Sequence, residues 1–244
     1  MSKASLAVTV ALQKQSRLIR IAIDDNEAER KISRHYWLVI CLIMPKAIKI
    51  WYNRGEGMNN IIDKIEQNPI IAAIRKEQDI EAVLDTPVTT VFLLQADIFN
   101  IDALVRKVQQ HGKSVFIHVD FLQGIDKDYK SIEYIVQKIK PNGIISTKSN
   151  YIQHAKQQGI FTVQRFFMVD SLSYKTTVRT VQSVKPDMIE IMPGVIPTII
   201  NRMQKEVTTP IIGGGLVINK EDIIEILKAG AVGVSTGKKE LWVL

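Results

Sequence analysis

Two turns rich in glycine and hydroxyl side chains lie in the C-terminal part of the chain. Gly213, Gly214 and Gly215 follow one short apolar run, and Ser235 and Thr236 close the next. Glycine lets backbone N–H groups come close to an anion, and a helix that begins after such a turn adds the positive end of its dipole. The two turns therefore predict a phosphate-binding site. The alternative is that three glycines merely form a tight turn.

Charged side chains stand where other apolar runs end, and they are Arg75, Asp120, Lys148, Arg165 and Glu190. The cations would bind phosphate and the carboxylates would accept hydrogen bonds from hydroxyl groups, which favours a phosphorylated polyol as ligand. The alternative is structural, with Arg165 and Glu190 paired to each other. Because side chains alternate along a strand, only one of Gln164 and Arg165 can point inward.

His118 and Asp120 are two residues apart, so on a strand both would point the same way. Such a pair can do acid–base chemistry or hold a metal, but the sequence favours a simpler interpretation, a hydrogen-bonded histidine of the core. No Ser-His-Asp arrangement, nucleophile elbow or zinc-ligand set appears in the sequence. We therefore expect no catalytic residue, no metal and no cofactor.

An alternation of strands and helices must position these residues. Short runs rich in β-branched residues alternate with amphipathic helical patterns from residue 58 onward. The predicted strands are 69–74, 90–94, 114–119, 143–146, 160–169, 187–192, 210–213 and 231–235. The predicted helices are 79–84, 101–110, 131–139, 150–158, 171–184, 196–205 and 220–228, with a short last helix that ends at Trp242.

Eight strand–helix units within residues 58–244 predict a compact (β/α)8 barrel of the TIM type. Continuously apolar strands that alternate with helices form a parallel sheet that is buried on both faces. The alternative is an open doubly wound sheet. In a barrel, the C-terminal ends of the strands form the binding face, and the candidate residues lie at those ends.

Residues 1–57 differ from the regular region. They hold 10 Lys and Arg against 5 Asp and Glu, whereas residues 58–244 hold 22 against 20, so most of the net charge of +7 lies outside the predicted barrel. The string Arg54-Gly55-Glu56-Gly57 before Met58 has the codon content of a translated ribosome-binding site. We expect Met58 to be the native start and residues 1–57 to be a non-family leader. The alternative is a genuine N-terminal extension, helical or irregular.

Composition excludes several classes of protein. With 46% hydrophobic and 23% charged residues, the chain is neither disordered nor fibrous. Its single cysteine, Cys41, forms no internal disulfide. The longest wholly apolar run, 37–44, is far shorter than the roughly 20 residues that cross a membrane as a helix. We expect a cytoplasmic protein without a membrane partner, whose binding of nucleic acid would not rest on bulk charge.

Seven collinear segments resemble the GlpP family, the glycerol-3-phosphate-responsive antiterminators of the glycerol-uptake operon. They are PIIAAIR (69–75), HVDFLQGIDKD (118–128), IKPNGIISTKSN (139–150), QRFFMVDS (164–171), IEIMPGVIPTII (189–200), PIIGGG (210–215) and ELW (240–242). The resemblance covers nearly all of 58–244, and proteins of this family begin near the position of Met58.

The resemblance implies a regulator rather than an enzyme. Members of the family sense glycerol 3-phosphate and act on the leader mRNA of glycerol-catabolism genes, where they prevent transcription termination. By this resemblance the two glycine and hydroxyl turns hold the phosphate, and Asp120, Arg165 and Glu190 lie at the glycerol end or in a network around it. The alternative function is a phosphate-handling barrel enzyme that acts on a glycerol phosphate.

The sequence does not identify an RNA-binding surface. Two clusters combine aromatic and basic residues: Phe166, Phe167, Tyr174, Lys175 and Arg179 in one, and Lys238, Lys239 and Trp242 in the other. Each has a plainer interpretation as core or solvated surface. A homodimer would merge two weak basic patches into one groove.

Overall fold

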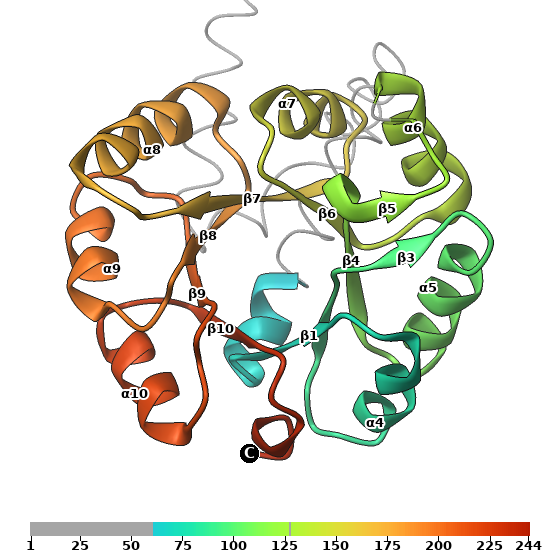
Figure 1. The fold of residues 1–244 in the computed structure, drawn as a ribbon, viewed down its shortest axis with the longest axis horizontal. Coiled ribbons are helices and arrows are strands. Elements are labelled where there is room, and N and C mark those ends of the chain that lie inside the picture. The colour runs from blue at the N-terminus through green and yellow to red at the C-terminus, as the bar shows by residue number, and fades with distance from the viewer. Residues whose placement is uncertain (1–60, 127) are drawn as a thin grey trace, which may run out of the picture. The chain divides into compact units, whose positions relative to one another are not determined.

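A closed barrel of eight parallel strands forms the core of this computed structural model, which describes residues 61–126 and 128–244 (Figure 1). The expectations about residues 1–57, including a native start at Met58, lie outside the described residues. The barrel strands are β1 (Ile70–Ile74), β2 (Thr90–Leu93), β4 (Ser114–His118), β6 (Gly143–Ser146), β7 (Phe161–Phe167), β8 (Met188–Met192), β9 (Ile211–Gly214) and β10 (Gly233–Thr236). They follow one another around the barrel in chain order, and β10 pairs with β1 to close it.

Helices surround the barrel on its outer side (Figure 1). The α-helices are α4 (Ile80–Leu84), α5 (Ile101–Gln110), α6 (Tyr129–Tyr134), α7 (Ser149–Gln157), α8 (Ser171–Val184), α9 (Pro197–Gln204) and α10 (Lys220–Lys228). Short 3-10 helices are η2 (Glu77–Asp79), η3 (Val119–Phe121) and η5 (Lys239–Leu241), and η4 (Ile135–Ile139) is a π-helix that continues α6. The predicted (β/α)8 barrel is confirmed.

Three local features differ from the prediction. β4 ends at His118 and the 3-10 helix η3 follows at once, so the alternation that would align His118 with Asp120 does not continue. The predicted helix 131–139 is α6 followed by the π-helix η4. Two strands of two residues each, β3 (Ala96–Asp97) and β5 (Leu122–Gln123), pair in the connections after β2 and β4. Strands this short leave no hydrophobic period in the sequence.

Each barrel strand divides its side chains between two cores. In β1, Ile70 and Ile74 pack into the cluster between the strands and the helices, while Ile71 packs into the interior cluster. Burying one such side chain contributes roughly 1.5–3 kcal/mol. This division explains why the strands are apolar on both faces, which was the pattern that predicted the barrel.

Three phenylalanines fill the middle of the interior. Phe92, Phe116 and Phe161 meet edge to face, with ring centroids 5.5 Å apart for the first pair and 5.7 Å for the second. A Cβ at Gly143 would overlap the ring of Phe116 and lie 2.8 Å from the carbonyl oxygen of Phe161. Only glycine at this position lets the aromatic layer form.

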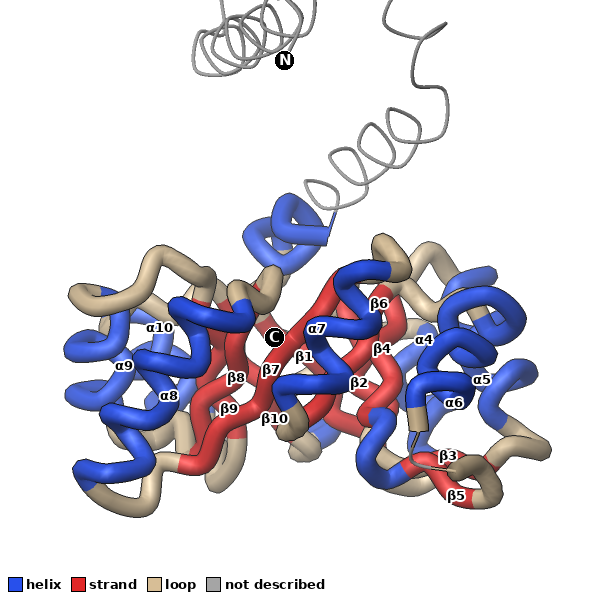
Figure 2. The backbone as a smooth tube through the Cα atoms, turned by 90° about the horizontal axis from the view of Figure 1, so that it is seen from above, coloured by secondary structure: helices blue, strands red, loops and turns tan. Residues whose placement is uncertain are grey.

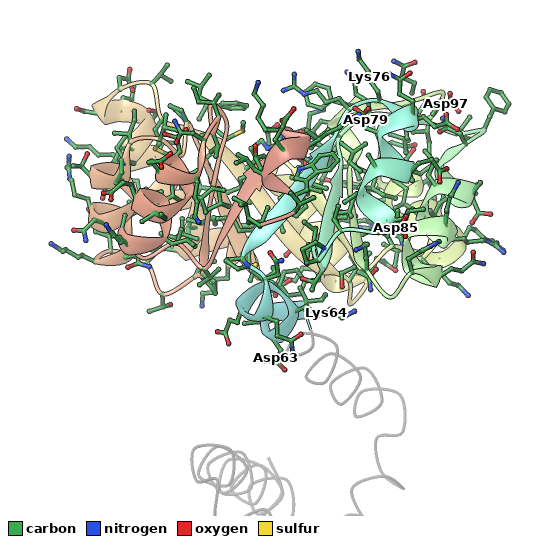
Figure 3. The ribbon with its side chains drawn as sticks, turned by 90° about the horizontal axis from the view of Figure 1, so that it is seen from below. Asp63, Lys64, Lys76, Asp79, Asp85 and Asp97 are labelled. Atoms are coloured by element: carbon green, nitrogen blue, oxygen red, sulfur yellow. The ribbon has the colours of Figure 1, made fainter. Side chains whose placement is uncertain are left out.

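A helix over 61–67 closes the barrel at the N-terminal ends of its strands. Ile61 and Ile65 belong to the interior cluster, and Ile65 is only 1% exposed. This helix lies at one end of the barrel and the β3–β5 sheet at the other (Figure 2). Figure 3 shows the same arrangement, with Asp63 and Lys64 at the end that carries this helix and Lys76 and Asp97 at the other end. The binding face predicted from the sequence is therefore the end away from this helix.

Shortening the closing residue should lower stability measurably. We expect Ile65→Val to reduce the free energy of unfolding by about 0.5–1.5 kcal/mol, because one buried methyl group is lost and a small cavity remains. The matched control is Ile224→Val on α10, whose side chain is 38% exposed and should change stability by less than about 0.5 kcal/mol. Urea unfolding of both variants checks this, and equal effects would contradict the role of Ile65.

Within residues 61–126 and 128–244, no helix is both long and apolar enough to cross a membrane.

Candidate functional site

The barrel interior changes from apolar to polar above the phenylalanines. His118, Arg165, Glu190 and Ser235 come from β4, β7, β8 and β10, and each is 6% exposed or less. Each stands two residues beyond an interior position of its own strand, so alternation turns it inward. These four residues are called the polar layer. It lies at the C-terminal ends of the strands, where (β/α)8 barrels bind their ligands. This open end of the barrel is called the mouth.

A buried carboxylate links three of the four residues. The Nε of Arg165 donates to Oε2 of Glu190 at 2.5 Å, and Oγ of Ser235 donates to Oε1 at 2.5 Å. A Cβ at Gly214 would overlap Ser235 Oγ and lie 2.5 Å from Glu190 Oε1. The structure thus brings together two predicted phosphate residues, Gly214 and Ser235, with the predicted pair of Arg165 and Glu190.

The ion pair leaves part of the arginine side chain available. Only the Nε of Arg165 donates a hydrogen bond within the described chain, so the N–H donors on its two Nη atoms remain for a ligand. Gln164 points the other way, and its Nε2 donates to Ser149 Oγ on α7 at 3.0 Å. Of these two neighbours, Arg165 is therefore the one that faces the interior.

Asp120 lies beside the polar layer and accepts three hydrogen bonds from the protein. Its Oδ1 accepts from Ser146 Oγ at 2.6 Å, and its Oδ2 accepts from the backbone N–H and the hydroxyl of Thr147 at 2.8 and 2.7 Å. Burial alone would raise the pKa of Asp120, but these hydrogen bonds and the nearby His118 together hold it below its ordinary value. Asp120 thus ties η3 to the end of β6, and its binding of a polyol stays a prediction.

His118 has a different environment from the one the sequence favours. It is 1% exposed, yet neither Nδ1 nor Nε2 has a hydrogen-bond partner in the described part of the chain, so the expected hydrogen bond is wrong. Its ring lies 4.6 Å from that of Phe121. Burial, and then the charge of Arg165, lower its pKa to about 4, against weaker opposing effects of Asp120 and of its own carbonyl. The ring is therefore neutral at pH 7.

This lowered pKa predicts a loss of stability in mild acid. As the pH falls from 6.5 to about 4, the unfolded chain takes up a proton at His118 before the folded chain does, so the free energy of unfolding decreases. One pKa unit corresponds to 1.36 kcal/mol, which gives a loss on the order of 2–3 kcal/mol. We expect His118→Phe to remove most of this loss. Urea unfolding at pH 7 and pH 4.5 measures it, and an unchanged pH dependence in the variant would contradict the assignment.

The predicted phosphate residues divide between the two sides of the barrel wall. Gly213 faces outward, where a Cβ would lie 2.5 Å from Ile226. Thr236 Oγ donates to the carbonyl oxygen of Val217 at 3.1 Å and so holds the β9–α10 turn against β10. Gly214 and Ser235 face the interior. Gly213 and Thr236 therefore shape the turns from outside, and direct contact with phosphate stays a prediction for all five.

Backbone N–H groups in these turns are available for an anion. Those of Gly215, Leu216 and Gly237 make no hydrogen bond to the residues that the structure describes. Gly215 and Leu216 have φ of +77° and +63°, a left-handed conformation that is uncommon for leucine. In such a turn, successive backbone N–H groups can point toward one anion, which they cannot do in an extended chain. Sequence reasoning found this turn but missed that Leu216 shares it.

The helix that follows begins with hydrogen bonds from its own side chains. Asn219 and Asp222 form a capping box at the start of α10, in which Asn219 Oδ1 accepts from the N–H of Asp222. Asp222 Oδ2 in turn accepts from the N–H of Ile218. The acidic side chain already occupies the positive end of the helix dipole. Binding of an anion by this helix N-terminus stays a prediction.

Arg75 and Lys148 lie on the rim of the mouth. Both are exposed, and neither forms an ion pair with any residue between 61–126 or 128–244. The Nζ of Lys148 lies 4.8 Å from the ring centroid of Tyr151. The structure thus places these two cations around the polar layer and not inside it, and their role in binding stays a prediction.

The residues considered for RNA divide between those that contact the protein itself and those that are exposed. Trp242 is 1% exposed and its Nε1 donates to the carbonyl oxygen of Thr236 at 2.9 Å. Tyr174 donates to Glu206, and Lys239 pairs with Asp79. Phe166 is partly buried, whereas Phe167, Lys175, Arg179 and Lys238 are exposed. These positions leave the RNA-binding surface unassigned.

No group of three or more His, Cys, Asp or Glu residues is arranged to hold a metal ion in the described ranges.

Comparison with known proteins gives consistent matches. A family model, described as glycerol-3-phosphate responsive antiterminator, matches residues 70–242. The uncharacterized protein YgcP of Escherichia coli (strain K12) is 33% identical over 184 residues, which cover 75% of this chain and 96% of that protein. The solved structure of a glycerol uptake operon antiterminator regulatory protein from Listeria monocytogenes is 36% identical with a TM-score of 0.70, covering 72% of this chain and 95% of that one. A glycerol uptake operon antiterminator-related protein from Thermotoga maritima is 31% identical with a TM-score of 0.65, covering 72% and 98%.

Proposed function

This chain belongs to the glycerol-3-phosphate responsive antiterminator family, and from that premise we propose that it senses glycerol 3-phosphate and binds the leader mRNA of glycerol-catabolism genes. With the ligand bound, it prevents transcription termination in the cytoplasm. Glycerol 3-phosphate is an effector in this scheme and is not consumed. The partners are the ligand, the leader mRNA and a second copy of the chain in a homodimer.

The observation that carries the ligand part of the proposal is the composition of the barrel mouth. The Nη donors of Arg165 and the N–H groups of Gly215, Leu216 and Gly237 are the donors that a phosphate group requires. The hydroxyl of Ser235 is already directed to Glu190. Arg75 and Lys148 add positive charge at the rim, which attracts the dianion.

The same mouth supports a regulator more than an enzyme. Its two buried carboxylates already accept hydrogen bonds, Asp120 three and Glu190 two. Asp120 has a pKa below its ordinary value, which makes it a weaker general base at neutral pH, and the Glu190 carboxylate is paired with Arg165. We therefore propose that the barrel binds its ligand without converting it.

A gel-shift titration tests this function directly. The protein beginning at Met58 is titrated into the leader RNA of the nearest glycerol-uptake gene, with and without glycerol 3-phosphate and at fixed salt, because phosphate contacts are sensitive to salt. We expect retention of the RNA that depends on the ligand. A ligand changes RNA affinity only by its differential affinity for two states, so a shift of at least about fivefold is expected.

The outcomes separate the candidate functions. Absence of RNA retention, together with a rise in melting temperature on adding glycerol 3-phosphate, would reject the antiterminator and leave a metabolite-binding protein. Turnover of glycerol 3-phosphate would instead establish the enzyme. RNA retention by a monomer at full affinity would remove the homodimer from the proposal.

A further inference from the structure

Within the polar layer, His118 alone makes no hydrogen bond to the described residues, whereas Arg165, Glu190 and Ser235 are joined to one another. We infer that the ring nitrogens of His118 bind the hydroxyl groups of the polyol phosphate and set the preference of the site for a hydroxylated carbon chain. This inference rests on the proposed sensing of glycerol 3-phosphate. It assigns a specificity role to a residue that sequence reasoning placed in the core.

The position of His118 fits contact with a ligand inside the mouth. It stands two residues beyond Phe116, which belongs to the interior cluster, so its side chain faces the barrel axis. Arg165 likewise stands two residues beyond an interior residue, Val163, so both buried side chains face the barrel interior. The ring of Phe121 lies 4.6 Å from that of His118, and Phe121 is itself 53% exposed.

The free-energy cost of burying an imidazole without hydrogen-bond partners supports the same conclusion. A buried polar group without a partner costs roughly 1–3 kcal/mol, and buried polar atoms in native proteins are rarely left unpaired. His118 carries two such atoms at 1% exposure. A ligand that supplies partners for them recovers part of this cost when it binds, whereas a ligand without hydroxyl groups does not.

Among these neighbours, His118 is the side chain whose polar atoms are both unpaired within the described residues. A neutral imidazole offers one donor and one acceptor, and each hydroxyl group of a polyol can serve as either. The carboxylates of Asp120 and Glu190 already hold hydrogen-bond donors from the protein. The remaining donors, on Arg165 and in the two turns, have no acceptor role and suit the phosphate. The two ends of glycerol 3-phosphate thus meet two different sets of groups.

The test compares two ligands that differ only in hydroxyl groups. Glycerol 3-phosphate and n-propyl phosphate share the phosphate and the three-carbon chain, and calorimetry gives their affinities for the wild type, His118→Phe and His111→Phe. His111 is exposed at the end of α5 and serves as the matched control. We expect the wild type to prefer glycerol 3-phosphate, and His118→Phe to bind it about tenfold more weakly while its affinity for propyl phosphate stays within twofold. His111→Phe should match the wild type.

Several outcomes would overturn the inference. If the wild type binds glycerol 3-phosphate and His118→Phe keeps the same preference, His118 is not a specificity residue, although the proposed function stands. If His118→Phe weakens both ligands equally, its role is structural. If the wild type binds neither ligand, the proposed function fails and the inference with it.

A measurement on the wild type covers the case in which His118→Phe does not fold. The imidazole nitrogen signals of His118, followed by NMR at pH 7, should shift on adding glycerol 3-phosphate and stay nearly unchanged with propyl phosphate. The signals of the exposed His111 provide the internal reference. Equal shifts with both compounds, or none with either, would overturn the assignment.

Discussion

Replacing Glu190 by alanine is expected to lower the free energy of unfolding by about 3–5 kcal/mol, because it leaves the charge of Arg165 buried and unpaired. Glu190 is fully buried, Arg165 is 6% exposed, and the carboxylate also accepts the hydroxyl of Ser235. A charge that is buried inside the barrel cannot recover its full hydration by a small side-chain movement. Urea unfolding at pH 7 measures the loss.

Two further variants show whether burial is the cause. Glu225→Ala removes an exposed carboxylate that pairs with Lys228 at 3.0 Å, and it should cost less than about 0.5 kcal/mol. The double variant Arg165→Met with Glu190→Leu should recover much of the lost stability, because neither charge then remains in the interior. A loss below about 1 kcal/mol for Glu190→Ala would show that the pair is hydrated in solution.

The second prediction concerns ligand binding. Gly214→Ala is expected to weaken glycerol 3-phosphate by about 10- to 100-fold, because the new methyl group overlaps Ser235 Oγ and lies 2.5 Å from Glu190 Oε1. Relieving such a contact costs typically 1–3 kcal/mol, and here the atoms that must move belong to the polar layer itself. Isothermal calorimetry measures the affinity, and a melting curve confirms that the variant is folded.

A glycine elsewhere separates this steric effect from loss of backbone freedom. Gly112 has a φ of +73°, but a Cβ there meets no atom within 4 Å. Gly112→Ala should therefore lower stability by roughly 1 kcal/mol through backbone strain and leave ligand affinity unchanged. An unaltered affinity in Gly214→Ala would mean that the ligand does not depend on the geometry of the polar layer.

The barrel was predictable because its signals are local. Each strand shows a short β-branched run, and the joints carry glycine or proline, so neither the strands nor their number required knowledge of the tertiary fold. Strand ends were less certain, since the alternation after His118 gives way to a 3-10 helix that no residue type announces. The strands β3 and β5 escaped detection because two residues carry no period.

The site was only partly predictable, because its contacts are between strands. The sequence left open whether Arg165 pairs with Glu190, and the register that sets them side by side on β7 and β8 decides it. Trp242 looked like a possible stacking surface, but the end of the chain folds back to place its indole under Thr236. The unpaired state of His118 depends on which side chains lie across the barrel, and no sequence spacing reports that.

The helix over 61–67 also determines how the protein can be handled. It closes the end of the barrel opposite the polar layer, so a solid support attached at Ile61 would lie on the side away from that layer (Figure 3). The C-terminus is a poorer attachment point, because Trp242 is buried and hydrogen-bonded to the strand that bears Ser235. Sensors that immobilise this protein should therefore hold it by its N-terminal side, which leaves the opposite end with the polar layer open to a ligand.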